Sequence, residues 1–196
     1  MRTLVVNLYG GPGAGKTTLA HWLVAELSKM GVLTEYVPEV AKALVWQGGR
    51  CLLDGSRENQ RFVTEAQIGL IDNLVGQVEV VVTDSPPALG LVYADKTDIY
   101  GYDDLKHLVF SQRGRQDCFD VFVNRSSCYD ERGRKHSAEE SLDLDRKIRQ
   151  LLGSMSSVDV FEYSRTDADI EGNFYDLLQT IFVRTWALSD CELIQP

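Results

Sequence analysis

The sequence predicts an α/β fold in which a five-stranded parallel sheet lies between two layers of helices. Short, continuously apolar segments alternate along the chain with longer segments whose apolar residues recur every three or four positions. Strands that are apolar throughout are typical of parallel sheets, because helices cover both faces of such a sheet. No repeat, low-complexity tract or long linker interrupts the alternation, so residues 1–196 are expected to form a single domain.

Five segments have the apolar character of buried strands. The expected strands are residues 3–8, 34–37, 79–83, 118–123 and 158–163. The carboxyl ends of parallel strands meet at one edge of the sheet, and ligands of open α/β folds bind there. Polar residues that follow these strands are therefore the first candidates for a functional site.

Helical periodicity separates the strands. A helix is expected from Lys16, with Leu19, Leu23, Leu27 and Met30 on one face, and Gly31 is expected to stop it. Further helices are expected over residues 39–46, over a segment that carries Val63, Ala66, Leu70 and Leu74, from about Ser137 with Glu140 in capping-box position, and over residues 170–186.

The loop after the first strand has the pattern G-x-x-x-x-G-K-[ST], in the order Gly10, Gly11, Pro12, Gly13, Ala14, Gly15, Lys16, Thr17. Glycines let backbone amides curl around an anion, and the following helix, with Thr18 in its first turn, adds its positive end. Lys16 can reach the β- and γ-phosphates, and the Thr17 hydroxyl can bind Mg²⁺. The pattern predicts a three-layer P-loop NTPase that binds ATP; the alternative is a glycine-rich turn that binds nothing.

The third strand is followed by Asp84, which can hold Mg²⁺ beside Thr17 and so complete the metal site of a phosphoryl-transfer enzyme. The alternative is a turn or helix cap before Pro86. The next residue is Ser85 rather than the glutamate with which hydrolytic ATPases orient water. The sequence therefore favours transfer over hydrolysis.

The second strand is followed by Glu39, whose carboxylate can accept the proton of a substrate hydroxyl that attacks the γ-phosphate. Asp84 is the other candidate for this base. Alternatively, Glu39 simply favours the start of the next helix, because acidic groups are stabilising there.

The fourth strand leads into an arginine-rich segment at about residues 125–137, which is expected to form a lid over the nucleotide. Arg125 is expected to contact the nucleotide, and Arg132 and Arg134 to neutralise charge on the transferring phosphate. The alternative is a mobile surface loop. The N-K-x-D pattern of guanine-specific GTPases is missing after this strand, so a GTPase switch is not expected.

Other polar and aromatic residues can contribute to an acceptor pocket. Arg61 and Gln67 are candidates to bind the acceptor's phosphate and base, with solvent exposure as the alternative. Trp46 and Phe62 can stack on a planar group, but core packing is the expectation for both.

The net charge of −9 argues against a general nucleic-acid binder, although residues 106–149 hold ten of the 20 Lys and Arg against eight acids. This basic segment suits a phosphate-handling edge or, alternatively, a mixed-charge surface. No apolar run approaches the ~20 residues of a membrane span, and no signal peptide is expected, so a cytoplasmic location without membrane contact is predicted.

These residues resemble the P-loop kinase superfamily, in its nucleoside and nucleotide kinase branch. The similarity rests on residues 10–18, Tyr36-Val-Pro-Glu39 and Thr83-Asp-Ser-Pro86. It implies a thymidylate-kinase-like fold with strand order 2-3-1-4-5, ATP and Mg²⁺ as cofactors, and a hydroxyl as acceptor. The acidic residue and arginine usual after the third strand of the family are Asp84 and Ser85 here, so the arginine must come from elsewhere. The V-P-E ending is also similar to that of ribosylnicotinamide kinases.

Asn124-Arg125, Tyr129, Gly133-Arg134, His136 and Glu139-Glu140 are similar to small kinase-like proteins of bacteriophages, and most to the 5-hydroxymethyluracil DNA kinases. That resemblance implies hydroxymethyluracil-containing DNA as acceptor, in DNA modification within a host cytoplasm. A free nucleoside such as nicotinamide riboside is the second hypothesis. A regulatory ATPase that works through a partner is the alternative from another class, and a homodimer remains open.

Overall fold

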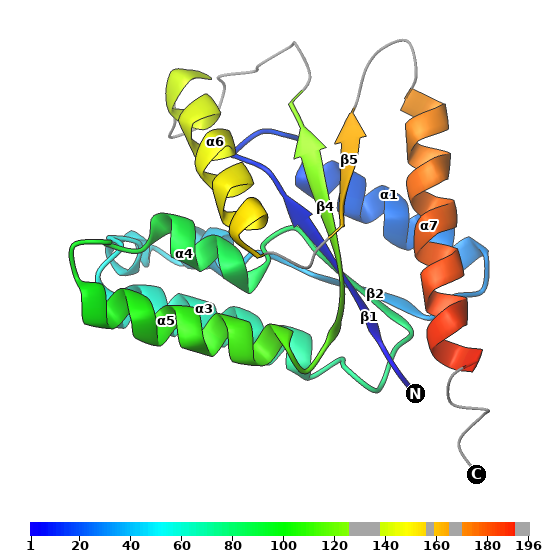
Figure 1. Ribbon diagram of the computed structural model, residues 1–196, viewed down its shortest axis with the longest axis horizontal. Helices are drawn as coiled ribbons and strands as arrows, with labels where there is room; N and C mark the ends of the chain where they lie inside the picture. Colours follow the sequence, from blue (N-terminus) through cyan, green and yellow to red (C-terminus); the bar gives the residue numbers. More distant parts are fainter. Residues whose placement is uncertain (126–137, 156–158, 165–169, 191–196) are drawn as a thin grey trace.

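The structure, a computed structural model, describes residues 1–125, 138–155, 159–164 and 170–190. Its centre is a five-stranded, wholly parallel sheet in the order β2-β3-β1-β4-β5, as predicted (Figure 1). The strands are β1 (Leu4–Tyr9), β2 (Thr34–Val37), β3 (Val80–Thr83), β4 (Asp117–Asn124) and β5 (Val160–Ser164).

The helices of the described chain are α1 (Lys16–Lys29), α2 (Val40–Trp46), α3 (Arg57–Asp72), α4 (Gly90–Tyr93), α5 (Ile99–Arg113), α6 (Ala138–Ser154) and α7 (Ile170–Asp190), with short 3-10 turns at Arg50–Leu52 and Pro87–Leu89. In these ranges, no helix has the length and apolar character that crossing a membrane requires. The predicted capping residue Ser137 lies outside the described residues.

The core lies on both faces of the sheet. On one face, Leu4, Val6 and Leu8 of β1 pack with leucines of α1 and with α7. On the other, Val5 packs with Ile71 of α3, and Tyr9 packs with residues of α4, α5 and α6. Figure 1 shows α1 and α7 together on one side of the sheet and α3, α4 and α5 on the other. Burial of every residue of β1 explains why this strand is apolar on both sides.

Two predicted helix faces need correction. In α3 the buried residues are Thr64, Gln67, Ile68 and Ile71, whereas Leu70 is exposed, so the face is rotated from the predicted one. Its apolar residues do not form a single stripe, because polar side chains share the buried face. In α1, Met30 follows the last helical residue and is exposed, because the chain turns at Gly31 with a φ of 85°.

Helix α5 was not predicted because its buried face is only partly apolar. That face consists of Gly101, Leu105, Val109 and Gln112, while Ile99 and Tyr100 at its start are exposed. The helix nevertheless begins at a clear cap, since the Asp98 side chain accepts a hydrogen bond from the Gly101 amide (3.0 Å).

A buried ion pair fixes the end of α5 to the sheet. Asp120 of β4 is fully buried and accepts two hydrogen bonds from the Arg113 guanidinium, at 3.0 and 2.7 Å. Asn7 of β1 donates a third hydrogen bond to the same carboxylate (3.0 Å). A buried charge is tolerated only when it is paired and hydrogen-bonded in this way.

The Asp120→Ala substitution is therefore expected to lower the free energy of unfolding by about 3–5 kcal/mol, because Arg113 loses its buried partner. The matched control is Asp117→Ala, on the same strand, where the carboxylate pairs with Arg2 at the surface. That control is expected to cost less than about 1 kcal/mol. Urea unfolding of both variants measures the difference; equal losses would contradict this role of the buried pair.

Candidate active site

The phosphate-binding loop connects β1 to α1 at the carboxyl edge of the sheet. Gly13 and Gly15 have φ angles of 82° and 97°, which residues with a side chain rarely adopt. The Ala14 amide closes a turn onto the Gly11 carbonyl (3.2 Å), and α1 begins at Lys16. The loop therefore has the backbone conformation that the motif predicts, and the unpaired amides at the start of α1 can face an anion.

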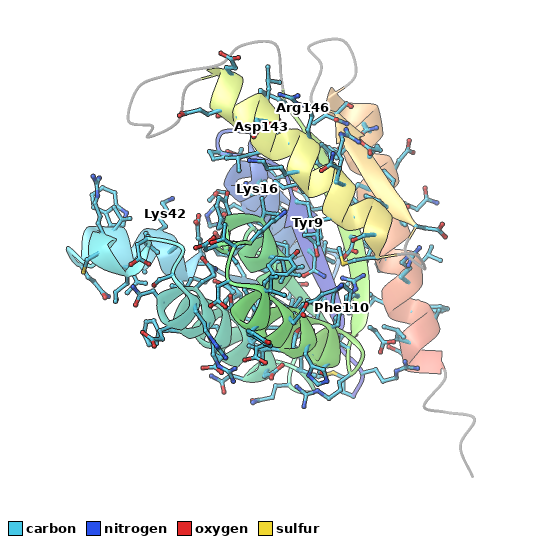
Figure 2. The ribbon with its side chains drawn as sticks, turned by 60° about the vertical axis from the view of Figure 1, so that its left-hand side comes forward. Tyr9, Lys16, Lys42, Phe110, Asp143 and Arg146 are labelled. Atoms are coloured by element: carbon cyan, nitrogen blue, oxygen red, sulfur yellow. The ribbon has the colours of Figure 1, made fainter. Side chains whose placement is uncertain are left out.

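Lys16 is the central cation of the site. Its Nζ atom donates hydrogen bonds to the Gly10 carbonyl (2.7 Å) and the Gly11 carbonyl (3.2 Å). Burial lowers its pKa, whereas the carboxylates of Glu39, Asp84 and Asp145 act in the opposite direction and favour the charged form. Figure 2 shows Lys16 between α2, which carries Lys42, and α6.

Thr17 and Asp84 meet as the motif predicts. The Thr17 hydroxyl donates a short hydrogen bond to Oδ2 of Asp84, which is 3% exposed. The other carboxylate oxygen, Oδ1, has no hydrogen-bond partner among the described residues. Asp84 therefore does not serve as a helix cap: the following turn is capped at Pro86. A buried carboxylate oxygen without a partner, beside a hydroxyl, fits a divalent cation.

Glu39 lies at the end of β2, at the N-cap position of α2. Its side chain makes no capping hydrogen bond. The alternative role, in which its charge favours the start of α2, needs no such bond and stays a prediction. Burial raises the pKa of Glu39, and the Asp84 carboxylate adds to the rise, while Lys16 opposes it. The side chain is thus close enough to Lys16 and Asp84 for their charges to act on it.

Two tyrosines that the sequence analysis did not select also face these charges. Burial and the Asp84 carboxylate raise the pKa of Tyr36, which lies on β2. Its ring packs against the His21 ring in a tilted arrangement, with centroids 4.7 Å apart and an interplanar angle of 56°. Tyr93 is 43% exposed, and partial desolvation raises its pKa to about 12, with contributions from the Glu39 and Asp145 carboxylates. Tyr36 directly precedes the V-P-E ending, so its position could have marked it as a site residue. No motif in the sequence marks Tyr93.

Arg125 lies beside the phosphate loop. Its Nη1 atom donates to the Pro12 carbonyl (2.8 Å), and its guanidinium pairs with Asp145 of α6 (3.1 Å). Asp145 was not predicted, because nothing distinguishes it from other acids of its helix. Arg132 and Arg134, and the lid beyond Arg125, lie outside the described residues, and the contacts of all three arginines with a nucleotide stay predictions.

The residues predicted to bind an acceptor lie in two different environments. Gln67 is buried: it accepts a hydrogen bond from the Val40 amide (3.0 Å) and donates to the Pro38 carbonyl (3.2 Å). It thereby holds the backbone on both sides of Glu39. Arg61 is exposed and pairs with Glu65 one turn away (2.8 Å). Contact of either residue with an acceptor remains a prediction.

The expectation that Trp46 and Phe62 pack in the core is wrong. Trp46 is 82% exposed at the end of α2, and Phe62 is 51% exposed on α3. Helix α2 has no buried residue at all, so it projects from the body instead of covering the core. Size and apolarity alone suggested burial, whereas exposure depends on where the helix lies.

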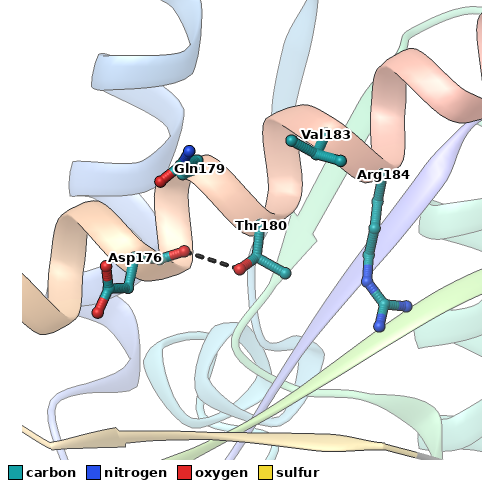
Figure 3. A pocket seen from close by; sticks show the side chains of 5 residues that line it. All are labelled: Asp176, Gln179, Thr180, Val183 and Arg184. Atoms are coloured by element: carbon teal, nitrogen blue, oxygen red, sulfur yellow. Dashed lines mark hydrogen bonds between the residues drawn. The ribbon is translucent and has the colours of Figure 1, made fainter.

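A shallow surface hollow lies elsewhere, along α7. Figure 3 shows its lining, which consists of Asp176, Gln179, Thr180, Val183 and Arg184. All five residues belong to one helix, and none belongs to the phosphate loop or the ends of β2 and β3. This hollow is therefore not part of the candidate active site.

The fold and the loop together define a P-loop NTPase with a kinase-like fold. The family model AAA_28, described as an AAA domain, matches residues 5–168. This range contains the phosphate loop, Glu39, Asp84 and Asp145, and the chain belongs to this family. Comparison with curated proteins gives no match.

Solved structures share the fold at low sequence identity. The NadR protein in complex with NR aligns over 93% of this chain with a TM-score of 0.69 and 14% identity; this chain spans 52% of that one. Thymidylate kinase from Candida albicans aligns over 93% of this chain and 92% of its own, with a TM-score of 0.59 and 14% identity. At this identity the likeness establishes the fold alone.

The Thr17–Asp84 pair predicts a measurable role for Mg²⁺. In Asp84→Asn the side chain can still accept the Thr17 hydrogen bond but loses its negative charge. We expect the gain in affinity for a non-hydrolysable ATP analogue on adding Mg²⁺ to fall about tenfold or more, while binding without Mg²⁺ persists. Calorimetry measures both affinities. Asp176→Asn on α7 is the control, and an unchanged Mg²⁺ effect in Asp84→Asn would contradict the metal site.

The raised pKa of Glu39 has a consequence for stability. A carboxyl with a raised folded-state pKa binds its proton more tightly when folded, so its contribution to stability falls as pH rises through that range. We expect Glu39→Gln to raise the melting temperature near neutral pH and to match the wild type below about pH 4, where the carboxyl is protonated in both states. Glu35→Gln, at an exposed site on β2, is the control. A melting temperature below the wild type's at neutral pH would refute this.

Proposed function

We propose that the protein is a Mg²⁺-ATP-dependent phosphotransferase that moves the γ-phosphoryl group to a hydroxyl. One observation carries the proposal: Lys16 lies among the carboxylates of Glu39 and Asp84, both of which favour its charged form. The Asp84 carboxylate accepts a hydrogen bond from the Thr17 hydroxyl and fits a metal site. The Glu39 carboxylate makes no capping hydrogen bond to α2. Phosphoryl transfer to an alcohol uses a cationic side chain that binds the phosphates, a metal site and a base in this arrangement.

Each residue then has a defined part. Lys16 leaves the Gly10 and Gly11 carbonyls and contacts the β- and γ-phosphates. Thr17 and Asp84 would hold Mg²⁺, which would neutralise phosphate charge. Glu39 accepts the proton of the acceptor hydroxyl, and the oxygen of that hydroxyl forms a bond to the γ-phosphorus. The bond between the γ-phosphorus and the oxygen that bridges it to the β-phosphate breaks, which releases ADP. Arg132 and Arg134 are the predicted source of further positive charge.

Glu39 suits the role of base better than Asp84. Oδ2 of Asp84 already accepts the Thr17 hydrogen bond, and the side chain is nearly inaccessible. The raised pKa of Glu39 brings its proton affinity closer to neutrality, where a general base is most effective.

For the acceptor, the hydroxyl of a nucleoside is proposed, either free or as hydroxymethyluracil in DNA. One observation favours the free nucleoside. Seven of the ten Lys and Arg residues of segment 106–149 lie in the described part of the chain. Five of these seven pair with acids, namely Arg113, Arg125, Arg146, Lys147 and Arg149. Paired charges contribute less to binding of a DNA backbone, and the chain as a whole carries a net charge of −9.

The proposal predicts how Glu39→Gln changes phosphoryl transfer. With γ-labelled ATP and a panel of nucleosides, nicotinamide riboside, ordinary DNA and hydroxymethyluracil DNA, the wild type is expected to label one acceptor. Glu39→Gln is expected to lose about 10²-fold or more in transfer rate, because the base is removed, with ATP affinity preserved. Glu35→Gln is the matched control on the same strand.

Three outcomes are informative. Equal transfer by Glu39→Gln and the wild type would exclude Glu39 as base. Labelling of hydroxymethyluracil DNA that weakens steeply with salt would identify DNA as the acceptor, whereas transfer to a free nucleoside is expected to depend little on salt. ATP hydrolysis that appears only with a macromolecular partner, without label in any acceptor, would instead support the regulatory ATPase and overturn the kinase.

A further inference from the structure

We propose that Asp145 is a positioning residue for the phosphate-binding loop, acting with Arg125 as a clamp on the loop's first turn. The inference rests on the proposed binding of nucleotide by this loop, but it concerns residues outside the motif. Asp145 is 134 positions away from Gly11 in the sequence and reaches it from α6, which packs on the other face of the sheet from α1.

The clamp holds both polar ends of the Gly11–Pro12 segment. The Gly11 amide donates a hydrogen bond of 2.6 Å to Oδ1 of Asp145. Arg125 donates to the Pro12 carbonyl at 2.8 Å and to Oδ2 of Asp145 at 3.1 Å. The side chains of Arg125 and Asp145 are 13% and 14% exposed. Charged hydrogen bonds shielded from water in this way are stronger than those at an open surface.

Gly11 itself shows how closely α6 approaches. A Cβ atom built on Gly11 would lie 2.7 Å from Oδ1 of Asp145 and 3.0 Å from the backbone carbonyl of Ser141, which is fully buried. There is no room for a side chain between the loop and α6. The glycine at this motif position is thus required by contact with α6, because its φ is not in the left-handed region.

The clamp acts on the part of the loop that does not bind phosphate through its amides. Pro12 has no N–H group, and the Gly11 amide is committed to Asp145. The carboxylate next to an anion site is neutralised by Arg125, so it does not repel the triphosphate. Fixing this turn presents the following amides to the phosphates in the binding-competent geometry, which reduces the conformational entropy lost on binding.

The test compares nucleotide affinity with stability. In Asp145→Ala, with Mg²⁺ and a non-hydrolysable ATP analogue, we expect a Kd about tenfold or more higher than that of the wild type. Asp145→Asn can still accept the Gly11 hydrogen bond but loses the charge pair with Arg125, so an intermediate Kd is expected. The matched control is Asp143→Asn on the same helix. Asp143 pairs with Arg146 and Lys147 at the surface (Figure 2), so this substitution is expected to leave Kd unchanged.

The melting temperature without nucleotide, measured on the same samples, separates positioning from folding. A Kd for Asp145→Asn and Asp145→Ala equal to the wild type's would overturn the inference, whatever their melting temperatures. If Asp145→Ala does not fold, Asp145→Asn alone decides: a raised Kd supports the clamp, and an unchanged Kd refutes it. Because the readout is nucleotide binding, failure of the clamp would leave phosphoryl transfer through Glu39 intact, and failure of transfer would leave the clamp intact.

Discussion

The candidate site depends on one group of charges, in which the half-buried ammonium group of Lys16 lies close enough to three carboxylates for their charges to act on it. Burial favours the neutral form of Lys16, while Glu39, Asp84 and Asp145 favour its charged form. Burial and Asp84 likewise favour the protonated form of Glu39. Such a group of charges is costly without partners, so it indicates a site shaped for a highly charged ligand. A triphosphate would supply negative charge to Lys16, and a divalent cation bound with it would supply positive charge to the carboxylates.

The parallel sheet is what brings these charges together. Lys16 follows β1, Glu39 follows β2 and Asp84 follows β3, and the order β2-β3-β1 makes these strand ends neighbours. Elsewhere the same sheet is stabilised by contacts with the helices, such as the Arg113–Asp120 pair that joins α5 to β4. In open α/β folds, ligands bind at the carboxyl ends of the strands, where the rigid sheet holds the functional side chains in place.

Residues marked by a motif or by the end of a predicted strand could be predicted from the sequence, and residues without such a signal could not. The sheet, its strand order, the phosphate loop and the meeting of Thr17 with Asp84 followed from apolar runs, motif spacing and family resemblance. Asp145 could not be found, because nothing in the sequence distinguishes it from the other acids of α6 as the partner of Gly11. Trp46 was misplaced in the core, since a sequence does not show that a short helix projects outward.

The most direct test of this account is a crystal structure of the protein with Mg²⁺ and a non-hydrolysable ATP analogue. The account predicts that Lys16 Nζ moves from the Gly10 carbonyl to the β- and γ-phosphates. Thr17 and Asp84 are expected to flank the metal, and the Glu39 carboxylate to face the terminal phosphate. A loop that stays without the analogue at saturating concentration, or a terminal phosphate with Glu39 turned away from it, would contradict the account.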